Sequence, residues 1–477
     1  MQRWLVFTML AACSEPSESA EVHRVVPELE LTVPKLEADT LRRYTAALAD
    51  ERMQGRGTAS AGGRRAKAWI AARMEELGLD VQRQRVPLIA YETTVREMNP
   101  DAIVHSELAS GSHAKAWPLV DAGYGIVAPE YGWNDYEGLP VGGAVVVVRS
   151  GEPPMTGSFE GDALTEHGRW TTKLERARTQ GAAGCLIVHD PRGAGYPWSV
   201  VQASFSGARF AAAPGPSQPL QIWGWTEEMP DASRLRATFE QRVHDIEEHN
   251  IVGRVGSGVA PFVVVTAHWD HLGTGPAGTF NGAMDNASGV AALLVLARAV
   301  KERHATKPLV GTVVFAATAA EEVGLLGART LAASMHADDV VAAINLDGMN
   351  VGPVTPTVEL VAPGRSTLDD LFATAVGRQG RRVLGDQSPS GGAAFRSDHA
   401  PFAARGIPTL YPQPGYSTSA NPALLAFGTQ RARRYHTTDD DYDPSWSFEG
   451  AVADAKAIYE VIVDLADAEV RPRRVGH

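Results

Sequence analysis

The stretch AHWDHLGTGPAGTFNGAMDNASGV, residues 267–290, decides the fold of this chain. The run 262–265 directly before it is apolar and largely β-branched, which predicts a buried strand over 262–267. Apolar residues at helical spacing follow the stretch and predict a helix over 287–303. The crossing between strand and helix contains four side chains that can bind a metal or a proton: His268, Asp270, His271 and Asp285.

Strands and helices alternate throughout the second half of the sequence. Further strands are predicted at 312–317, 340–346 and 407–411, and a helix is predicted at 449–466. This alternation is typical of an α/β fold with a mostly parallel mixed sheet flanked by helices. In such sheets ligands bind beyond the carboxyl ends of the strands. Three acids follow predicted strands in this way, so we expect them to meet His268 at one edge: Glu321, Glu322 and Asp347.

The first half of the sequence differs from the second in composition and in its pattern of predicted elements. Apolar positions at helical spacing over 39–78 end at Gly78, and residues 81–89 alternate like a strand. From about 100 to 240 come most of the tryptophans, many Gly and Pro turns, and short predicted elements: strands 144–148 and 185–189 and a helix 170–180. We interpret this region as a compact β-rich module inserted in the chain.

Composition narrows the class of partner. The chain has 56 acidic and 44 basic residues and no basic stripe, which argues against nucleic acid as a partner. Its two cysteines exclude a disulfide framework and a thiolate zinc site. Cys185 lies in an apolar run, which predicts a buried, inert thiol.

The N-terminal sequence MQRWLVFTMLAAC predicts export. A short apolar run is followed by residues 10–13, Leu-Ala-Ala-Cys, which resemble a bacterial lipobox with Cys13 as the lipidated residue. Residues 1–13 are then the signal, and 14–37 a Ser-, Glu- and Pro-rich tether. We expect a membrane-anchored lipoprotein facing the periplasm or cell exterior, with the lipid at Cys13 as its only membrane contact. An ordinary cleaved signal and an uncleaved N-terminus are the alternatives.

The polar residues at the expected sheet edge suit a pair of divalent ions. Imidazole and carboxylate ligands without thiolates favour zinc at a catalytic rather than a structural site. One carboxylate can bridge two ions that polarise a carbonyl and activate a water. Of two adjacent acids only one need bind an ion, which leaves the other free as general base.

Five segments carry a resemblance to a known family: AHWDHLG, NGAMDNASG, AAEEVGLLGA, INLDGMN and RRYHTTDDDYD. In order and spacing they resemble the motifs of the zinc-dependent aminopeptidases, a family that also includes glutamate carboxypeptidases, glutaminyl cyclases and non-catalytic transferrin receptors. VDAGYGIVAPEYGWNDY and GAAGCLIVHDP resemble the protease-associated domain that many members contain. The resemblance implies a phosphorylase/hydrolase-like zinc exopeptidase fold formed by 38–99 and 244–470, with the inserted domain at 100–243.

The resemblance also implies roles for individual residues. One zinc ion would be bound by His268, Asp285 and Asp347, and the other by Asp285, Glu322 and His436. Glu321 would be the general base, Asp270 would orient the imidazole of His268, and Tyr435 would hydrogen-bond the developing oxyanion. Arg396 would hold the substrate carbonyl or the product carboxylate. His271 is interpreted as structural, and the acidic run 439–443 as a solvated loop rather than a calcium site.

The expected activity is that of a di-zinc exopeptidase, in first place an aminopeptidase that hydrolyses N-terminal residues of peptides through a metal-bridging water activated by Glu321. A carboxypeptidase, a glutaminyl cyclase-type acyltransferase and a receptor-like member without catalysis remain alternatives. The stretch after His436 is too short for the C-terminal helical dimerisation domain of the glutamate carboxypeptidases, which favours the aminopeptidase. Side-chain specificity, oligomeric state and the role of the inserted module stay open at this point.

Overall fold

The computed structural model describes residues 36–153, 159–468 and 470–473, which belong to one compact unit. Cys13, the predicted signal and nearly all of the predicted tether lie outside the described residues.

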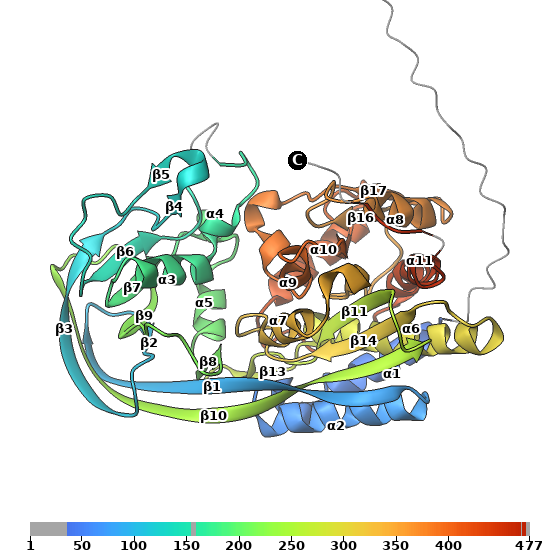
Figure 1. Ribbon diagram of the computed structural model, residues 1–477, viewed down its shortest axis with the longest axis horizontal. Coiled ribbons are helices and arrows are strands. Elements are labelled where there is room, and N and C mark those ends of the chain that lie inside the picture. Colours follow the sequence, from blue (N-terminus) through green and yellow to red (C-terminus); the bar gives the residue numbers. More distant parts are fainter. Residues whose placement is uncertain (1–35, 154–158, 469, 474–477) are drawn as a thin grey trace, which may run out of the picture. The chain divides into compact units, whose positions relative to one another are not determined.

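Four parallel strands form the part of the sheet that carries the expected chemistry. Their order is β18 (Thr409–Leu410), β15 (Val340–Asn345), β11 (Phe262–His268) and β14 (Thr312–Thr318). Two long antiparallel strands extend this sheet, β10 (Arg234–Gly256) next to β14 and then β1 (Asp80–Asn99) (Figure 1). The predicted α/β fold with a mostly parallel mixed sheet is therefore confirmed.

Apolar strands become the centre of this sheet because helices cover both of its faces. Val264 of β11 packs with Leu331 of α7 (Leu326–Ala333) and Phe402 of α9 (Ala400–Ala403). The opposite face is covered by α6 (Ser288–Thr306) and α11 (Glu449–Ala466). Within the described residues one helix, Ala283–Thr306, is long and apolar enough to cross a membrane, but 89% of its apolar window is buried. It is the core helix of this fold, as its packing on β11 and β14 requires.

The helical segment predicted over 39–78 is divided in two. It forms α1 (Ala38–Leu48) and α2 (Ala61–Glu76), with the irregular turn η1 (Glu51–Arg56) between them. Gly55 has φ +64°, and a Cβ there would lie 2.3 Å from the carbonyl oxygen of Gly273. Only glycine fits this close approach, which lies in the turn after α1 has ended at Leu48. Helix α2 begins after Ser60, whose side chain accepts the N–H of Gly63.

The inserted module, residues 100–243, continues the same sheet. The chain enters at the far end of β1 and returns along β10, which pairs with β3 (Gly111–Asp121). Three more strands are parallel to β3, and α3 (Trp170–Thr179) packs on them: β6 (Val145–Arg149), β7 (Gly184–Val188) and β9 (Ile222–Thr226). The module is thus α/β rather than only β-rich, and β10 runs without a break across the predicted boundary at 243/244.

The strands and helix predicted inside the module are present, and its core is aromatic. Trp223 and Trp225 of β9 are buried with Phe205, and Cys185 is buried in β7. Burial raises the pKa of the Cys185 thiol to about 12, which agrees with an inert side chain.

The remaining elements are short or peripheral. The helices among them are η2 (Pro129–Tyr131), η3 (Glu166–Gly168), α4 (Pro191–Ala194), α5 (Trp198–Ser204), η4 (Ala283–Ala287), η5 (Ala337–Asp339), α8 (Leu368–Gly377), η6 (Pro389–Gly391), η7 (Ala393–Phe395) and α10 (Pro422–Arg434). The strands are β2 (Ile103–His105), β4 (Val127–Ala128), β5 (Trp133–Asn134), β8 (Arg209–Ala212), β12 (Gly273–Gly275), β13 (Gly278–Phe280), β16 (Thr357–Leu360), β17 (Arg382–Leu384) and β19 (Pro412–Pro414).

Candidate metal centre

The predicted metal ligands meet at the carboxyl ends of the parallel strands. His268 ends β11, Glu322 lies four residues after β14, and Asp347 two residues after β15. Asp285 comes from η4, directly before α6, and His436 from the loop after α10. Nitrogen and oxygen atoms of these side chains lie within 4.8 Å of one another in overlapping groups. We call the five residues, together with Glu321, the acidic cluster.

The acidic cluster has two halves that share Asp285. In the His268 half, Nε2 of His268 lies 3.2 Å from Oδ1 of Asp285 and 3.3 Å from Oδ1 of Asp347. In the His436 half, Nε2 of His436 lies 3.3 Å from Oδ2 of Asp285 and 3.1 Å from Oε2 of Glu322. Each half therefore presents one imidazole nitrogen and two carboxylate oxygens, and each oxygen of Asp285 belongs to a different half.

These distances fit zinc. A zinc ion with ligand bonds of about 2.0–2.1 Å holds tetrahedral ligand atoms about 3.3 Å apart. The four separations of 3.1–3.3 Å match that spacing in both halves. The donor set is nitrogen and oxygen only, as in catalytic zinc sites, and its carboxylates are largely withdrawn from solvent. Carboxylates gathered out of solvent are costly without positive charge between them, so the donor set and its burial both call for cations.

The charges of the cluster are strongly coupled. Burial opposes the protonated form of His436, but the carboxylates of Glu322 and Asp285 outweigh it and raise its pKa to about 10. Burial also opposes ionisation of Glu322, but the facing His436 outweighs it and lowers its pKa to about 2. Since zinc binds the neutral imidazole, a metal ion must replace a proton at each histidine.

Glu321 stands apart from its neighbour Glu322. Its side chain is buried, and its backbone N–H donates to Oδ1 of Asp270 at 3.1 Å. Burial raises the pKa of Glu321 well above its usual range, and the negative charges of Glu322 and Asp347 add to this despite the opposing His268. A carboxylate of raised pKa is suited to accept and return a proton.

Asp270 contacts the His268 imidazole that it is expected to orient, and the structure shows which of its groups does so. The His268 ring is held through Nδ1 by the backbone carbonyl of Asp270, at 3.0 Å, rather than by its carboxylate. The carboxylate instead accepts hydrogen bonds from the backbone N–H of Glu321 and from the hydroxyl of Thr58. Both groups of Asp270 thus position the cluster, the carbonyl through His268 and the carboxylate through the segment of Glu321.

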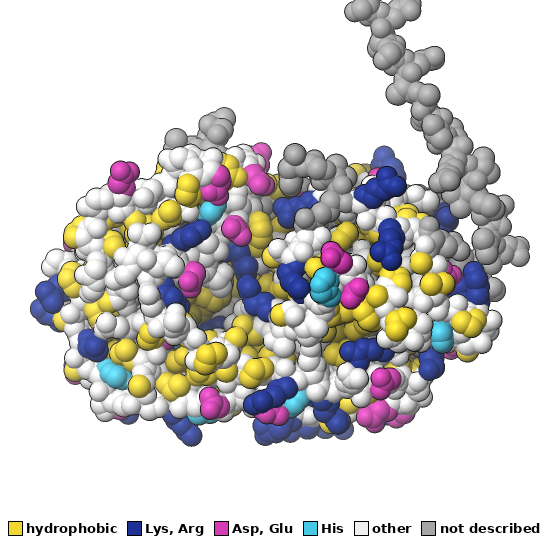
Figure 2. All heavy atoms as spheres, in the orientation of Figure 1, with side chains coloured by type: hydrophobic (Ala, Val, Ile, Leu, Met, Phe, Trp, Pro, Cys, Tyr) yellow, Lys and Arg dark blue, Asp and Glu magenta, His cyan; other side chains and the backbone are white. Residues whose placement is uncertain are grey.

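Tyr435 and Arg396 flank the cluster without entering it. Tyr435 is 43% exposed, and its ring stacks on that of His436 with centroids 4.0 Å apart. Arg396 donates to the carbonyl of Ala194 and lies over the ring of Tyr196 at 4.8 Å, so both of these contacts are with the inserted module. The face drawn in Figure 2 is hollowed between α5 and α9, where Lys and Arg side chains gather.

Several residues that position the cluster carry no motif of their own. Arg56 is fully buried and donates to the carbonyls of Trp269, Asn281, Gly282 and Leu48 at 2.6–2.9 Å, which fixes the crossing between β11 and α6. Asp440 lies in the acidic run interpreted as solvated, yet it is buried. Its carboxylate accepts the backbone N–H groups of Met284 and Asp285, a contact from a distant loop that the local sequence does not signal.

The inserted module also contributes to the cluster. The hydroxyl of Ser204, at the end of α5, lies 2.9 Å from Nδ1 of His436. A serine in a short helix about 230 residues away has no sequence signal for such a role, and only the fold brings it there.

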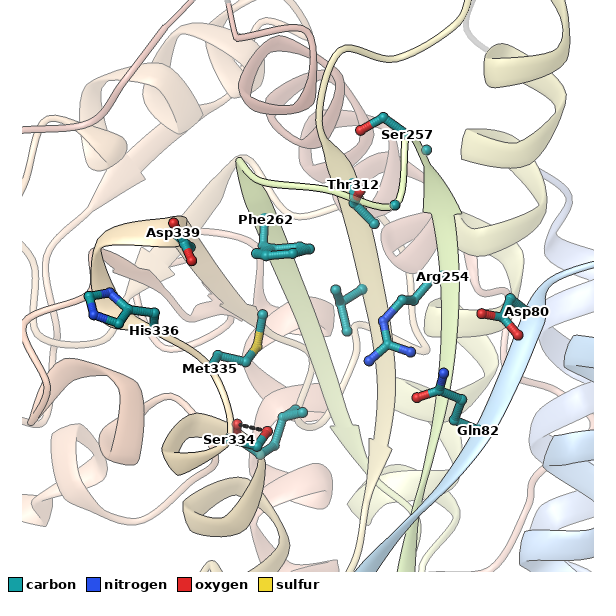
Figure 3. Close-up of a pocket in the computed structure, with 14 residues that line it drawn as sticks. Asp80, Gln82, Arg254, Ser257, Phe262, Thr312, Ser334, Met335, His336 and Asp339 are labelled. Carbon is teal, nitrogen blue, oxygen red and sulfur yellow. Dashed lines mark hydrogen bonds between the residues drawn. The ribbon is translucent and has the colours of Figure 1, made fainter.

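A cavity of about 660 Å³ lies elsewhere, at the amino ends of β11 and β14 (Figure 3). Phe262 and Thr312, the first residues of these strands, line it with Arg254, Met335 and His336. Ligands of parallel sheets bind at the carboxyl ends, where the acidic cluster lies, so this cavity is separate from the candidate site.

Comparisons with known proteins agree with the motifs. Residues 250–459 match the family model described as Peptidase family M28, which confirms the resemblance derived from the sequence. The Probable lipoprotein aminopeptidase LpqL of Mycobacterium tuberculosis is 27% identical over 334 residues, which are 66% of this chain. The chain spans 58% of the length of that relative.

Two solved structures share the fold across nearly the whole chain. BSAP, a zinc aminopeptidase from Bacillus subtilis, has a TM-score of 0.56 and 20% identity, with 92% of this chain and 97% of that chain covered. An aminopeptidase from Aneurinibacillus sp. strain AM-1 has a TM-score of 0.55 and 19% identity, with 90% and 94% covered. At these identities the likeness establishes the fold.

Proposed function

We propose, from the membership of residues 250–459 in peptidase family M28, that this chain is a zinc-dependent aminopeptidase with two zinc ions in the acidic cluster. One ion would be held by His268, Asp285 and Asp347, and the other by Asp285, Glu322 and His436. The observation that carries the proposal is the spacing of 3.1–3.3 Å between ligand atoms in both halves, with one oxygen of Asp285 in each.

The residues of the chain then divide the work of peptide hydrolysis. Zinc bound in such a site polarises a carbonyl and lowers the pKa of a water to near 7. Glu321 is assigned the general-base role, because it is the buried carboxylate of the cluster that belongs to neither proposed set of zinc ligands. It would take the proton of the attacking water and deliver it to the leaving amine.

Two flanking residues are assigned to the substrate. Tyr435 is assigned the hydrogen bond to the developing oxyanion, and its exposed ring, stacked on that of His436, supports this role. Arg396 would bind the substrate carbonyl or the product carboxylate. Its guanidinium contacts Ala194 and Tyr196 of the inserted module, four residues before α9 begins, which supports a role at the boundary between the two.

Removal of N-terminal residues, rather than C-terminal ones, is favoured by the relatives. The mycobacterial relative and both solved structures are named aminopeptidases. The mycobacterial relative is named a lipoprotein, which supports an exported chain with a lipid at Cys13.

We also propose that residues 100–243 form a protease-associated domain, as the sequence resemblance implies.

The test is a hydrolysis panel on the soluble form without residues 1–13, with zinc content measured in parallel. It compares aminoacyl substrates with a free amine against N-acetylated ones, and free C-termini against amidated ones. We expect turnover of free-amine substrates alone, regardless of the C-terminus, with two zinc ions per chain. Turnover that is abolished by amidation of the C-terminus contradicts the aminopeptidase and indicates a carboxypeptidase. A single ion in an active preparation favours the cyclase-type alternative.

A further inference from the structure

His271 is a buried histidine of the crossing that the proposed ligand set does not use. It is 1% exposed, and its Nδ1 lies 2.7 Å from Oε1 of Glu322. Its ring meets that of His436 edge to face, with centroids 5.6 Å apart. His271 therefore contacts two members of the His436 half, Glu322 and His436, but is not one of the ligands proposed for it.

The His271 ring is closely packed by the segment around Gly282 in the orientation that faces Glu322. Gly282 packs against it so closely that a Cβ there would lie 2.5 Å and 2.6 Å from two ring carbons. On the other side, the backbone N–H of His271 donates to the carbonyl of Arg56. The ring is thus clamped with Nδ1 toward Glu322, while Nε2 is buried without a hydrogen-bond partner among the described residues.

The contact between His271 and Glu322 assigns the two oxygens of that carboxylate to different tasks. An ionised carboxylate only accepts hydrogen bonds, so Nδ1 of His271 carries the proton and donates it to Oε1. The other oxygen, Oε2, faces His436 at 3.1 Å. Glu322 can then bind an ion through Oε2 while Oε1 keeps its hydrogen bond to His271.

The other half of the cluster repeats this arrangement with a different donor. Oδ1 of Asp347 faces His268, while Oδ2 accepts a hydrogen bond from the hydroxyl of Ser397 at 2.5 Å. Ser397 in turn accepts from the amide of Asn345 at 2.6 Å. The carboxylates of Asp347 and Glu322 are therefore each held through the oxygen that does not face the proposed histidine ligand of their half, by Ser397 in the first case and by His271 in the second.

We propose that His271 is a positioning residue of the metal centre, whose Nδ1–H holds Oε1 of Glu322 so that Oε2 alone is presented to the ion of the His436 half. The inference rests on the proposed function, since it assumes an ion there. Groups that orient a metal ligand commonly change metal affinity about 10- to 100-fold when removed. The loss of affinity should concern only the ion of the His436 half.

The test uses His271→Ala and His271→Asn in the full-length protein, with zinc affinity measured by competition with chelators of graded strength. The side-chain amide of Asn places an N–H near the position of Nδ1, so it can keep the hydrogen bond to Glu322, whereas Ala cannot. We expect His271→Ala to bind one of two zinc ions about 10- to 100-fold more weakly. His271→Asn should stay within a few-fold of wild type. The urea unfolding midpoint of both variants without metal shows whether either loses its fold.

The proposal is overturned if His271→Ala binds both ions as wild type does. It is also overturned if His271→Asn loses the same ion as His271→Ala while both remain folded, because the imidazole itself would then be required as a ligand. Wild-type protein that binds no zinc contradicts the proposed function itself. That outcome is distinct from two wild-type ions with unaffected variants, which overturns the role of His271 alone.

Discussion

Buried histidines behave in opposite ways in the inserted module and in the acidic cluster. His105 of β2 is 4% exposed and packs on Trp223, with ring centroids 4.9 Å apart. Burial lowers its pKa to about 3, and the nearby Arg209 adds to this. His436 is just as enclosed, but the carboxylates of Glu322 and Asp285 overcome burial and raise its pKa to about 10.

The difference teaches that burial alone does not mark a functional histidine. A ring among apolar and aromatic neighbours stays neutral and stabilises the core by packing. A ring among several carboxylates is protonated or binds a cation, and such perturbed groups gather at functional sites. The excess of acid around His268 and His436 is what distinguishes the acidic cluster from the aromatic core of the inserted module.

The largest effect that separates the two regions is expected from a matched pair of substitutions. With His436 as the proposed zinc ligand, His436→Gln replaces an imidazole by a weakly binding amide, so one of the two proposed zinc ions should be lost and peptidase activity should fall about 100-fold or more. His105→Gln removes an equally buried ring that faces no carboxylate. It should keep both ions and activity within about two-fold of wild type. Zinc content and kcat/KM of both variants test this prediction. Equal zinc loss in the two variants would contradict the distinction between the histidines of the acidic cluster and of the inserted module.

A smaller effect concerns pH and the inserted module. The pKa of His105 is about 3 in the folded protein, below the usual 6.5 that it regains on unfolding. The unfolded chain therefore binds more protons below pH 6.5, and the stability that the neutral ring provides above 6.5 is lost as pH falls toward 3. From pH 8 to pH 5 the loss amounts to about 2 kcal/mol.

Urea unfolding of wild type and His105→Gln at both pH values measures this pH-dependent loss of stability. The difference in the free energy of unfolding between the two proteins should shrink by that amount at pH 5. A difference that does not change with pH would mean that His105 is protonated in the folded state.

The sequence predicts the fold and the main members of the site because both depend on local signals. The apolar strand 262–267 and the core helix after it follow from periodicity, and the chemistry falls at the end of that strand as α/β topology requires. His268 and Asp347 come together because their parallel strands end at the same edge, and Asp285 joins them from η4, directly before the core helix α6.

What the sequence does not predict depends on contacts between distant segments. Asp270 orients His268 by its carbonyl, and only the backbone path decides between carbonyl and carboxylate. Arg56 and Asp440 look like surface charges in their local sequence. Each is buried and hydrogen-bonds backbone groups of the crossing between β11 and α6. These partners are more than 150 residues away in sequence from Asp440 and more than 200 residues away from Arg56. No periodicity signals such partners.

The adjacent acids Glu321 and Glu322 provide the most direct measurement, since identical substitutions should have different consequences. Glu321→Gln should retain two zinc ions and lose about 10²- to 10⁴-fold in kcat, because under the proposed assignment only the general base is removed. Glu322→Gln should lose one ion. Zinc content and kcat of the two variants, measured side by side, decide the assignment. A Glu321→Gln protein that keeps two ions and near-normal activity, or that loses zinc as Glu322→Gln does, would contradict it.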